Sequence, residues 1–130
     1  MSDHLSEARR IIQDTLVIDT LGGAVVHPTP HVDEGTTYEE QVLGYGWSAI
    51  NACLVSEPSY NATFDEVLKA MYENFLYFEM SPRVKHVETV DDLLAAKAEG
   101  RLGVFFGLQS GSCLEQDRKR LRILHKLGLR

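Results

Sequence analysis

The chain has 130 residues, of which 44% are hydrophobic and 25% are charged. This composition is typical of one folded domain and excludes a largely disordered or fibrous chain. The 13 Lys and Arg residues and 19 Asp and Glu residues give a net charge of −6. We therefore expect no nucleic-acid partner, because proteins that neutralise phosphates usually present a basic surface.

The N-terminus and the apolar runs bear on where the protein resides. The first ten residues are polar and lack the apolar core of a signal peptide. No uninterrupted apolar run reaches the roughly 20 residues that a membrane-spanning helix needs. We expect a cytoplasmic protein without membrane association, in which Cys53 and Cys113 are buried free thiols and not a disulfide.

Apolar runs alternate along the chain with segments of helical periodicity. The predicted elements, in chain order, are a helix from Ser2 through Ile12, a strand over 15–20, a short helix from Thr36 or Thr37 through Val42, a strand over 47–55, a helix from Thr63 that ends before Pro82, a helix from Thr89 to Glu99, a strand over 101–109, and a basic helix that carries Leu114, Leu121, Leu124 and Leu127 and ends at Gly128. The helices that begin at Thr63 and Thr89 each have a capping acid three residues later.

This alternation predicts an α/β fold with parallel strands and an N-terminal helix. Leu129 and Arg130 would lead into a further strand, and three strands with an open edge form an incomplete sheet. A (β/α)₈ TIM-type barrel needs about 250 residues. We therefore interpret residues 1–130 as a single partial domain, the first three βα units of such a barrel.

Three segments resemble the membrane (renal) dipeptidase family: residues 16–23, 87–111 and 121–130. The middle segment is the most specific, because a capped helix leads into a strand that ends in a Gly-x-x-Gly-like turn. The resemblance covers most of the chain from about residue 15. It implies a metal-dependent hydrolase of the amidohydrolase type, which cleaves dipeptides with two zinc ions held at the carboxyl ends of barrel strands.

The resemblance also implies three metal-ligand positions, and this sequence departs from the family at each. Leu21 stands where the family has a histidine, Gly23 where it has an aspartate, and Gln109 where it has a bridging glutamate. A neutral amide supplies none of the negative charge that two close dications require. We therefore expect no metal at these positions, and zinc is a cofactor by resemblance only.

Other residues offer alternatives. His27, His31 and Asp33 lie after the first strand and are alternative metal ligands, although they also suit a polar surface loop. Gln109, Ser110 and Asp19 are candidate substrate-binding residues, and Asp19 also suits a role in fixing the loop. Cys113 is more consistent with a packed thiol than with a nucleophile, and no catalytic residue is assigned.

Two functional hypotheses follow. The first is a dipeptidase-like hydrolase fragment that acts on a small peptide or amide, with its N-terminal metal-ligand positions substituted. The alternative is a catalytically inactive barrel homologue that binds a small ligand or partner. The sequence decides neither enzymatic activity nor whether a homo-oligomer forms.

Overall fold

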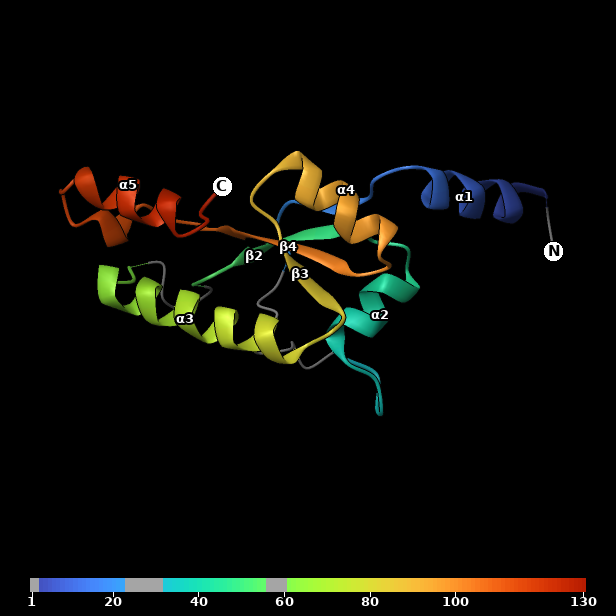
Figure 1. The fold of residues 1–130 in the computed structure, drawn as a ribbon, viewed down its shortest axis with the longest axis horizontal. Helices are drawn as coiled ribbons and strands as arrows, with labels where there is room; N and C mark the ends of the chain where they lie inside the picture. The colour runs from blue at the N-terminus through green and yellow to red at the C-terminus, as the bar shows by residue number, and fades with distance from the viewer. Residues whose placement is uncertain (1–2, 23–31, 56–60) are drawn as a thin grey trace.

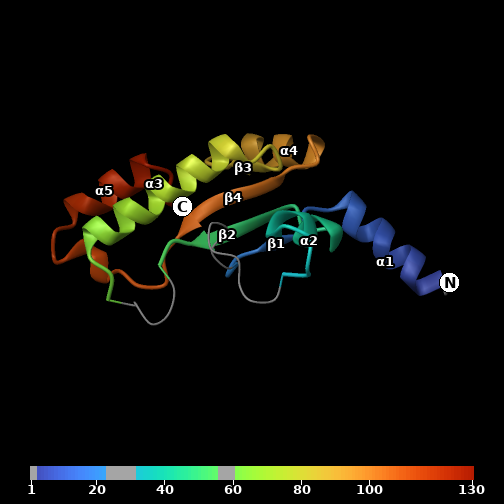
Figure 2. The same cartoon turned by 90° about the horizontal axis from the view of Figure 1, so that it is seen from below.

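The computed structural model describes residues 3–22, 32–55 and 61–130. In these ranges the elements are, in chain order, α1 (Asp3–Asp14), β1 (Ile18–Asp19), α2 (Tyr38–Gly44), β2 (Ala49–Cys53), α3 (Phe64–Met80), β3 (Val84–His86), α4 (Val90–Ala98), β4 (Leu102–Gly107), the 3-10 turn η1 (Ser112–Leu114) and α5 (Lys119–Lys126). Helices and strands alternate as predicted (Figure 1), and the N-terminal helix α1 projects from one end of the sheet (Figure 2). Ser2, its predicted cap, lies outside the described residues.

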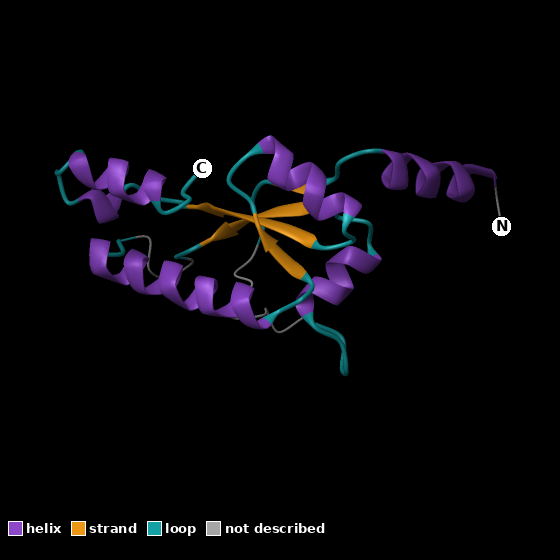
Figure 3. Ribbon diagram, in the orientation of Figure 1, coloured by secondary structure: helices purple, strands orange, loops and turns teal. Residues whose placement is uncertain are grey.

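The strands form one parallel sheet in the order β1-β2-β4-β3. β2 and β4 pair from Ala49 beside Gly103 to Cys53 beside Gly107. Figure 3 shows the helices arranged around the strands, which lie at the centre of the view. The predicted α/β class is confirmed, because parallel neighbours need crossover connections of the kind that α3 and α4 provide.

The prediction of three strands is wrong, because the sheet contains a further strand, β3. Val84–His86 pairs with Leu102–Val104. Three residues that include a lysine give no apolar pattern, so their strand conformation comes from pairing with β4. Farther along the same edge, Leu129 forms a parallel bridge with Phe106, and the Arg130 amide donates to the Phe106 carbonyl at 3.0 Å. The strand expected after the last helix therefore begins beside β4.

The last helix is shorter than predicted. Leu114 belongs to the separate turn η1, and α5 begins only at Lys119. Glu115 and Gln116, which lie between the two, have φ angles of 46° and 67°. These left-handed conformations interrupt a right-handed helix.

One face of the sheet carries the hydrophobic core. Ile50, Val104 and Phe106 are fully buried there. The helices supply the apolar side chains that cover them, among which are Val42 of α2, Met71 of α3 and Leu124 of α5. Because side chains alternate along a strand, residues 49, 51 and 53 of β2 belong to the opposite face.

Two further expectations concern the cysteines and the membrane. Cys53 and Cys113 are both free and buried, as predicted. Within residues 3–22, 32–55 and 61–130, no helix combines the length and apolar character needed to cross a membrane.

Candidate functional site

The carboxyl ends of β1, β2 and β4 meet at a small pocket of about 110 Å³. The parallel register brings these ends to the same edge of the sheet, where barrel and doubly wound folds bind their ligands. Its lining residues are Thr20, Leu21, Asn51, Cys53, Gly107, Leu108 and Gln109. The polar groups of this strand-end pocket are thus a hydroxyl, two carboxamides and a thiol.

Asn51 is the polar residue that the sequence analysis missed. The Asn51 carboxamide lies against the backbone of Gly107 in β4. A Cβ atom added to Gly107 would lie 1.9 Å from Asn51 Oδ1. A side chain at position 107 would therefore displace Asn51. The Oδ1 atom is buried and has no hydrogen-bond partner among the described residues. The available signal was an asparagine within an otherwise small and apolar strand, since buried polar groups usually need partners.

The thiol of Cys53 already has a hydrogen-bond partner. Its Sγ lies 2.9 Å from the Val55 carbonyl oxygen and donates to it. Cys113 lies outside the strand-end pocket, in the core cluster with Met71 and Phe106. Burial raises the pKa of the Cys113 thiol and so disfavours the nucleophilic thiolate. These observations fit the packed-thiol interpretation of Cys113.

The structure brings together two of the three positions where the resemblance implies metal ligands. Leu21 and Gln109 both line the strand-end pocket, whereas Gly23 lies outside the described residues. An alkyl side chain and a neutral amide do not fit a pair of zinc ions, which require anionic or imidazole ligands. The described part of the chain also contains no cluster of three or more His, Cys, Asp or Glu residues able to hold a metal.

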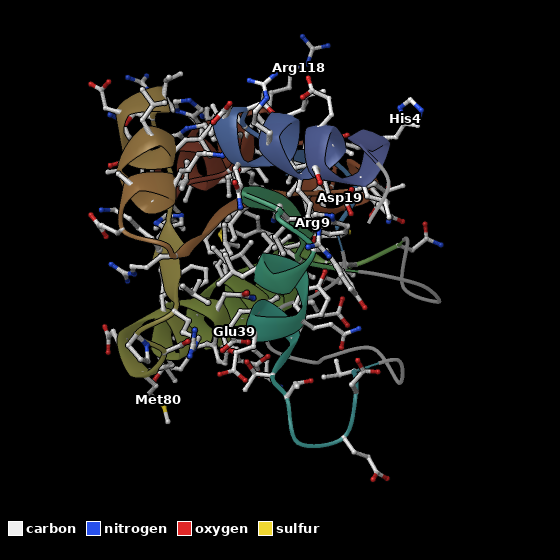
Figure 4. The ribbon with its side chains drawn as sticks, turned by 90° about the vertical axis from the view of Figure 1, so that its right-hand side faces the viewer. His4, Arg9, Asp19, Glu39, Met80 and Arg118 are labelled. Carbon is white, nitrogen blue, oxygen red and sulfur yellow. The ribbon has the colours of Figure 1, made fainter. Side chains whose placement is uncertain are left out.

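Asp19 and Ser110 make local contacts instead of lining this pocket. Asp19, which is labelled in Figure 4, accepts a hydrogen bond at Oδ1 from the Leu21 amide at 2.9 Å, and this bond fixes the turn after β1. Asp19 also pairs in register with Ile50, so the two residues share the core face and not the face of Asn51. Ser110 Oγ accepts a hydrogen bond from the Ser112 amide at 3.1 Å. Of the three candidate substrate-binding residues, only Gln109 lines the pocket.

The alternative metal ligands stay a prediction. His27 and His31 lie outside the described residues. Asp33 is exposed, and its backbone is held in place by Gln41 and Thr36.

No family model matches the sequence, and a search of curated proteins finds no match. Among solved structures, an amidohydrolase from Pseudomonas aeruginosa aligns with a TM-score of 0.77 at 19% identity, over 93% of this chain and 34% of its own. The probable dipeptidase PvdM from the same organism aligns with a TM-score of 0.69 at 14% identity, over 96% of this chain and 36% of its own. The chain therefore shares its fold with part of each of these two proteins.

This likeness confirms the fold class predicted from the sequence, a section of a TIM-type barrel. The chain spans about a third of the length of the two solved structures.

Proposed function

We propose that the strand-end pocket binds the small peptide or amide substrate of a dipeptidase-like hydrolase. The observation that carries this proposal is the presence of two carboxamides, those of Asn51 and Gln109, in one pocket at the carboxyl ends of parallel strands. Support comes from the fold, which resembles that of an amidohydrolase and of a probable dipeptidase. Active sites of barrel enzymes lie at this end of the strands.

Carboxamides suit an amide substrate because each offers both a hydrogen-bond donor and an acceptor. In this proposal Asn51 and Gln109 bind and orient the substrate amide, and Thr20 adds a hydroxyl. Positions 21, 23 and 109 do not hold a zinc pair, because leucine, glycine and glutamine supply no negative charge to it. The groups that perform the chemical step are therefore not assigned to these positions.

A second candidate is a catalytically inactive barrel homologue that binds a small ligand or partner in the same pocket. The observation that favours it is the pair of Leu21 and Gln109, which stand together where the resemblance implies metal ligands. Both candidates predict binding, and only the first predicts turnover.

Turnover of a panel of dipeptides and N-acetylated amides by the purified protein, prepared without chelator, tests the first candidate. We expect hydrolysis of at least one compound, and we expect Gln109→Leu to raise its KM about five- to tenfold, since one uncharged hydrogen bond contributes about 1 kcal/mol. Gln13→Leu, an exposed substitution on α1, is the matched control and should leave KM unchanged.

Two results would contradict the proposal. Binding without turnover across the whole panel would favour the inactive homologue. Two tightly bound zinc ions per chain, measured by mass spectrometry and lost in Gln109→Leu, would show that these positions do build a metal centre.

A further inference from the structure

Glu115 has an uncommon backbone conformation in the loop that follows Gln109. Its φ and ψ angles of 46° and 43° are left-handed, and Gln116, the next residue, has a φ of 67°. Residues other than glycine rarely adopt this conformation, and they keep it only where surrounding contacts fix it. Two such residues in succession therefore indicate that contacts hold this loop in place.

The side chain of Glu115 supplies two of these contacts. Its Oε1 accepts a hydrogen bond from the Phe64 amide at 2.9 Å, and its Oε2 lies 2.6 Å from Arg120 Nη1. Phe64 is the first residue of α3, where a backbone amide has no acceptor within the helix. The hydrogen bond from this amide and the pairing with Arg120 lower the pKa of the Glu115 carboxyl, so it is ionised at neutral pH. Arg120 in turn packs over the Phe64 ring, with its guanidinium carbon 4.9 Å from the ring centre.

Two serines extend this connection toward Gln109. Ser112 Oγ donates a hydrogen bond to the Ala62 carbonyl oxygen at 3.2 Å, just before α3 begins. The Ser112 amide donates to Ser110 Oγ at 3.1 Å. A series of contacts therefore runs from the start of α3 to the residue that follows Gln109.

The two segments joined by these contacts both leave the sheet at the strand-end pocket. The segment that leads to α3 follows β2, which ends at Cys53, and the loop follows β4, which ends at Gly107. Cys53, Gly107 and Gln109 all line the pocket. Gln109 is exposed, so burial does not fix its position. Contacts that hold the loop against α3 restrain the backbone from which the Gln109 side chain extends.

We propose that Glu115 is a positioning residue for substrate binding, which holds Gln109 in place at the strand-end pocket through the loop that joins them. This inference rests on the proposed function and deepens it, because it names the residue that sets the position of a substrate-binding carboxamide. Glu115 does not touch the substrate. It acts through Gln109, so its effect on the KM is no larger than that of Gln109 itself.

Glu115→Gly tests this role because it removes the carboxylate and suits the left-handed backbone. Glycine adopts a positive φ without strain, so a weaker binding of substrate would come from the lost side-chain contacts. We expect Glu115→Gly to raise the KM of a hydrolysed amide about three- to fivefold and to leave kcat unchanged. Gln116→Gly makes the same replacement at the neighbouring left-handed position, and this matched control should leave the KM unchanged.

A double-mutant cycle separates positioning from a general loss of structure. In the Gln109→Leu background, Glu115→Gly should not raise the KM further, because the residue through which it acts is already changed. Hydrogen exchange followed by mass spectrometry, without substrate, supplies a readout besides activity. Exchange over residues 108–114 should be faster in Glu115→Gly than in Gln116→Gly or the unaltered protein.

The outcomes separate this inference from the proposed function. If the unaltered protein hydrolyses an amide and Glu115→Gly has the same KM, the positioning role is wrong while the proposed function stands. The same conclusion follows if the effects of Glu115→Gly and Gln109→Leu on the KM are fully additive, or if exchange over residues 108–114 is unchanged. If the unaltered protein neither binds nor hydrolyses any compound of the panel, both the proposed function and the inference fail.

Discussion

His86 is a half-buried imidazole among aromatic rings. Its ring centroid lies 5.4 Å from those of Phe75 and Phe78 and 4.8 Å from that of Phe106. The Nε2 atom is buried and has no hydrogen-bond partner among the described residues. Burial is the main reason why the pKa of His86 lies below its usual value of 6.5.

The charges around His86 modify this effect without removing it. Glu88 and Asp92 favour the protonated ring and so raise its pKa, whereas Arg130 lowers it. Glu88 Oε1 is 3.9 Å from the Nδ1 atom, and the other carboxylate oxygen of Glu88 pairs with Arg130 at 2.8 Å. The net direction is downward, so the folded protein holds His86 neutral more strongly than the unfolded chain does.

We expect the free energy of unfolding to decrease as the pH falls from about 7.5 to about 5. Between the lowered pKa of the folded state and the ordinary pKa near 6.5, the unfolded chain binds more protons, and acid therefore favours unfolding. The contribution of His86 is fully present above the ordinary value and is lost as the pH falls toward the folded one. Denaturant titrations of the unaltered protein and of His86→Phe measure it, and His86→Phe should have the smaller pH dependence.

The matched control for this prediction is His125→Phe, at an exposed position near the end of α5. It should leave the pH dependence unchanged. Equal slopes for the unaltered protein and His86→Phe would mean that the buried imidazole does not couple stability to pH.

Among the helices, α3 depends on a local signal at its first turn. Thr63 Oγ1 accepts from the Glu66 amide at 3.3 Å, and Glu66 Oε2 accepts from the Thr63 amide at 2.7 Å. These bonds satisfy two backbone amides that have no partner within the helix. The same reciprocal pair starts α2 at Thr37 and α4 at Thr89.

Thr63→Ala should lower the free energy of unfolding by about 1 kcal/mol, the usual cost of losing an N-cap side chain. Chemical denaturation followed by circular dichroism measures the change. Asn61→Ala, two residues earlier and exposed, is the comparison variant and should have little effect. Equal stability of Thr63→Ala and the unaltered protein would show that the capping box contributes nothing to α3.

Lys97 connects α4 to the end of α1. Its ammonium group donates to the carbonyl oxygen of Thr15 and lies 3.5 Å from both the Ile12 carbonyl oxygen and Ser48 Oγ. A cation at this place complements the negative end of the helix dipole of α1. The rest of α1 is largely exposed and projects from the sheet in Figure 2, so this contact is one of its few attachments.

Lys97→Met should therefore loosen the end of α1 while leaving the sheet intact. Hydrogen exchange followed by mass spectrometry should show faster exchange over residues 11–15 and unchanged exchange in β4. Lys69→Met removes an exposed lysine of α3 and should change neither region. Unaltered exchange over residues 11–15 in Lys97→Met would mean that packing alone holds α1.

Over the whole molecule, the sequence predicts the elements that carry their own local signals. The helices α3 and α4 begin at capping residues, and the strands β2 and β4 lie within the predicted apolar runs. β3 has no such signal, because Lys85 and His86 do not distinguish a three-residue strand from a loop. The edge of β4 imposes its conformation, and such a long-range effect cannot be predicted from a local window.

The sequence likewise predicts some residues of the candidate site and misses others. Positions 21 and 109 could be placed at one pocket through the resemblance, and the structure brings them together. Asn51 could not be placed there from the sequence, because its position depends on the register of β2 with β4 and on the glycine at position 107. A strand with small residues on both faces does not indicate which neighbour will lie beside each of them.

The shared edge of β4 has a consequence for how the molecule unfolds. Val84–His86 occupies the first half of that edge, and Leu129 meets the second half at Phe106. Two segments more than 40 residues apart in the chain thus complete the hydrogen bonding of one strand. Neither segment has a partner until β4 is in place, and β4 has exposed amides until both arrive. The sheet should therefore unfold as one cooperative unit, because the pairing of either segment with β4 affects the stability of the other segment.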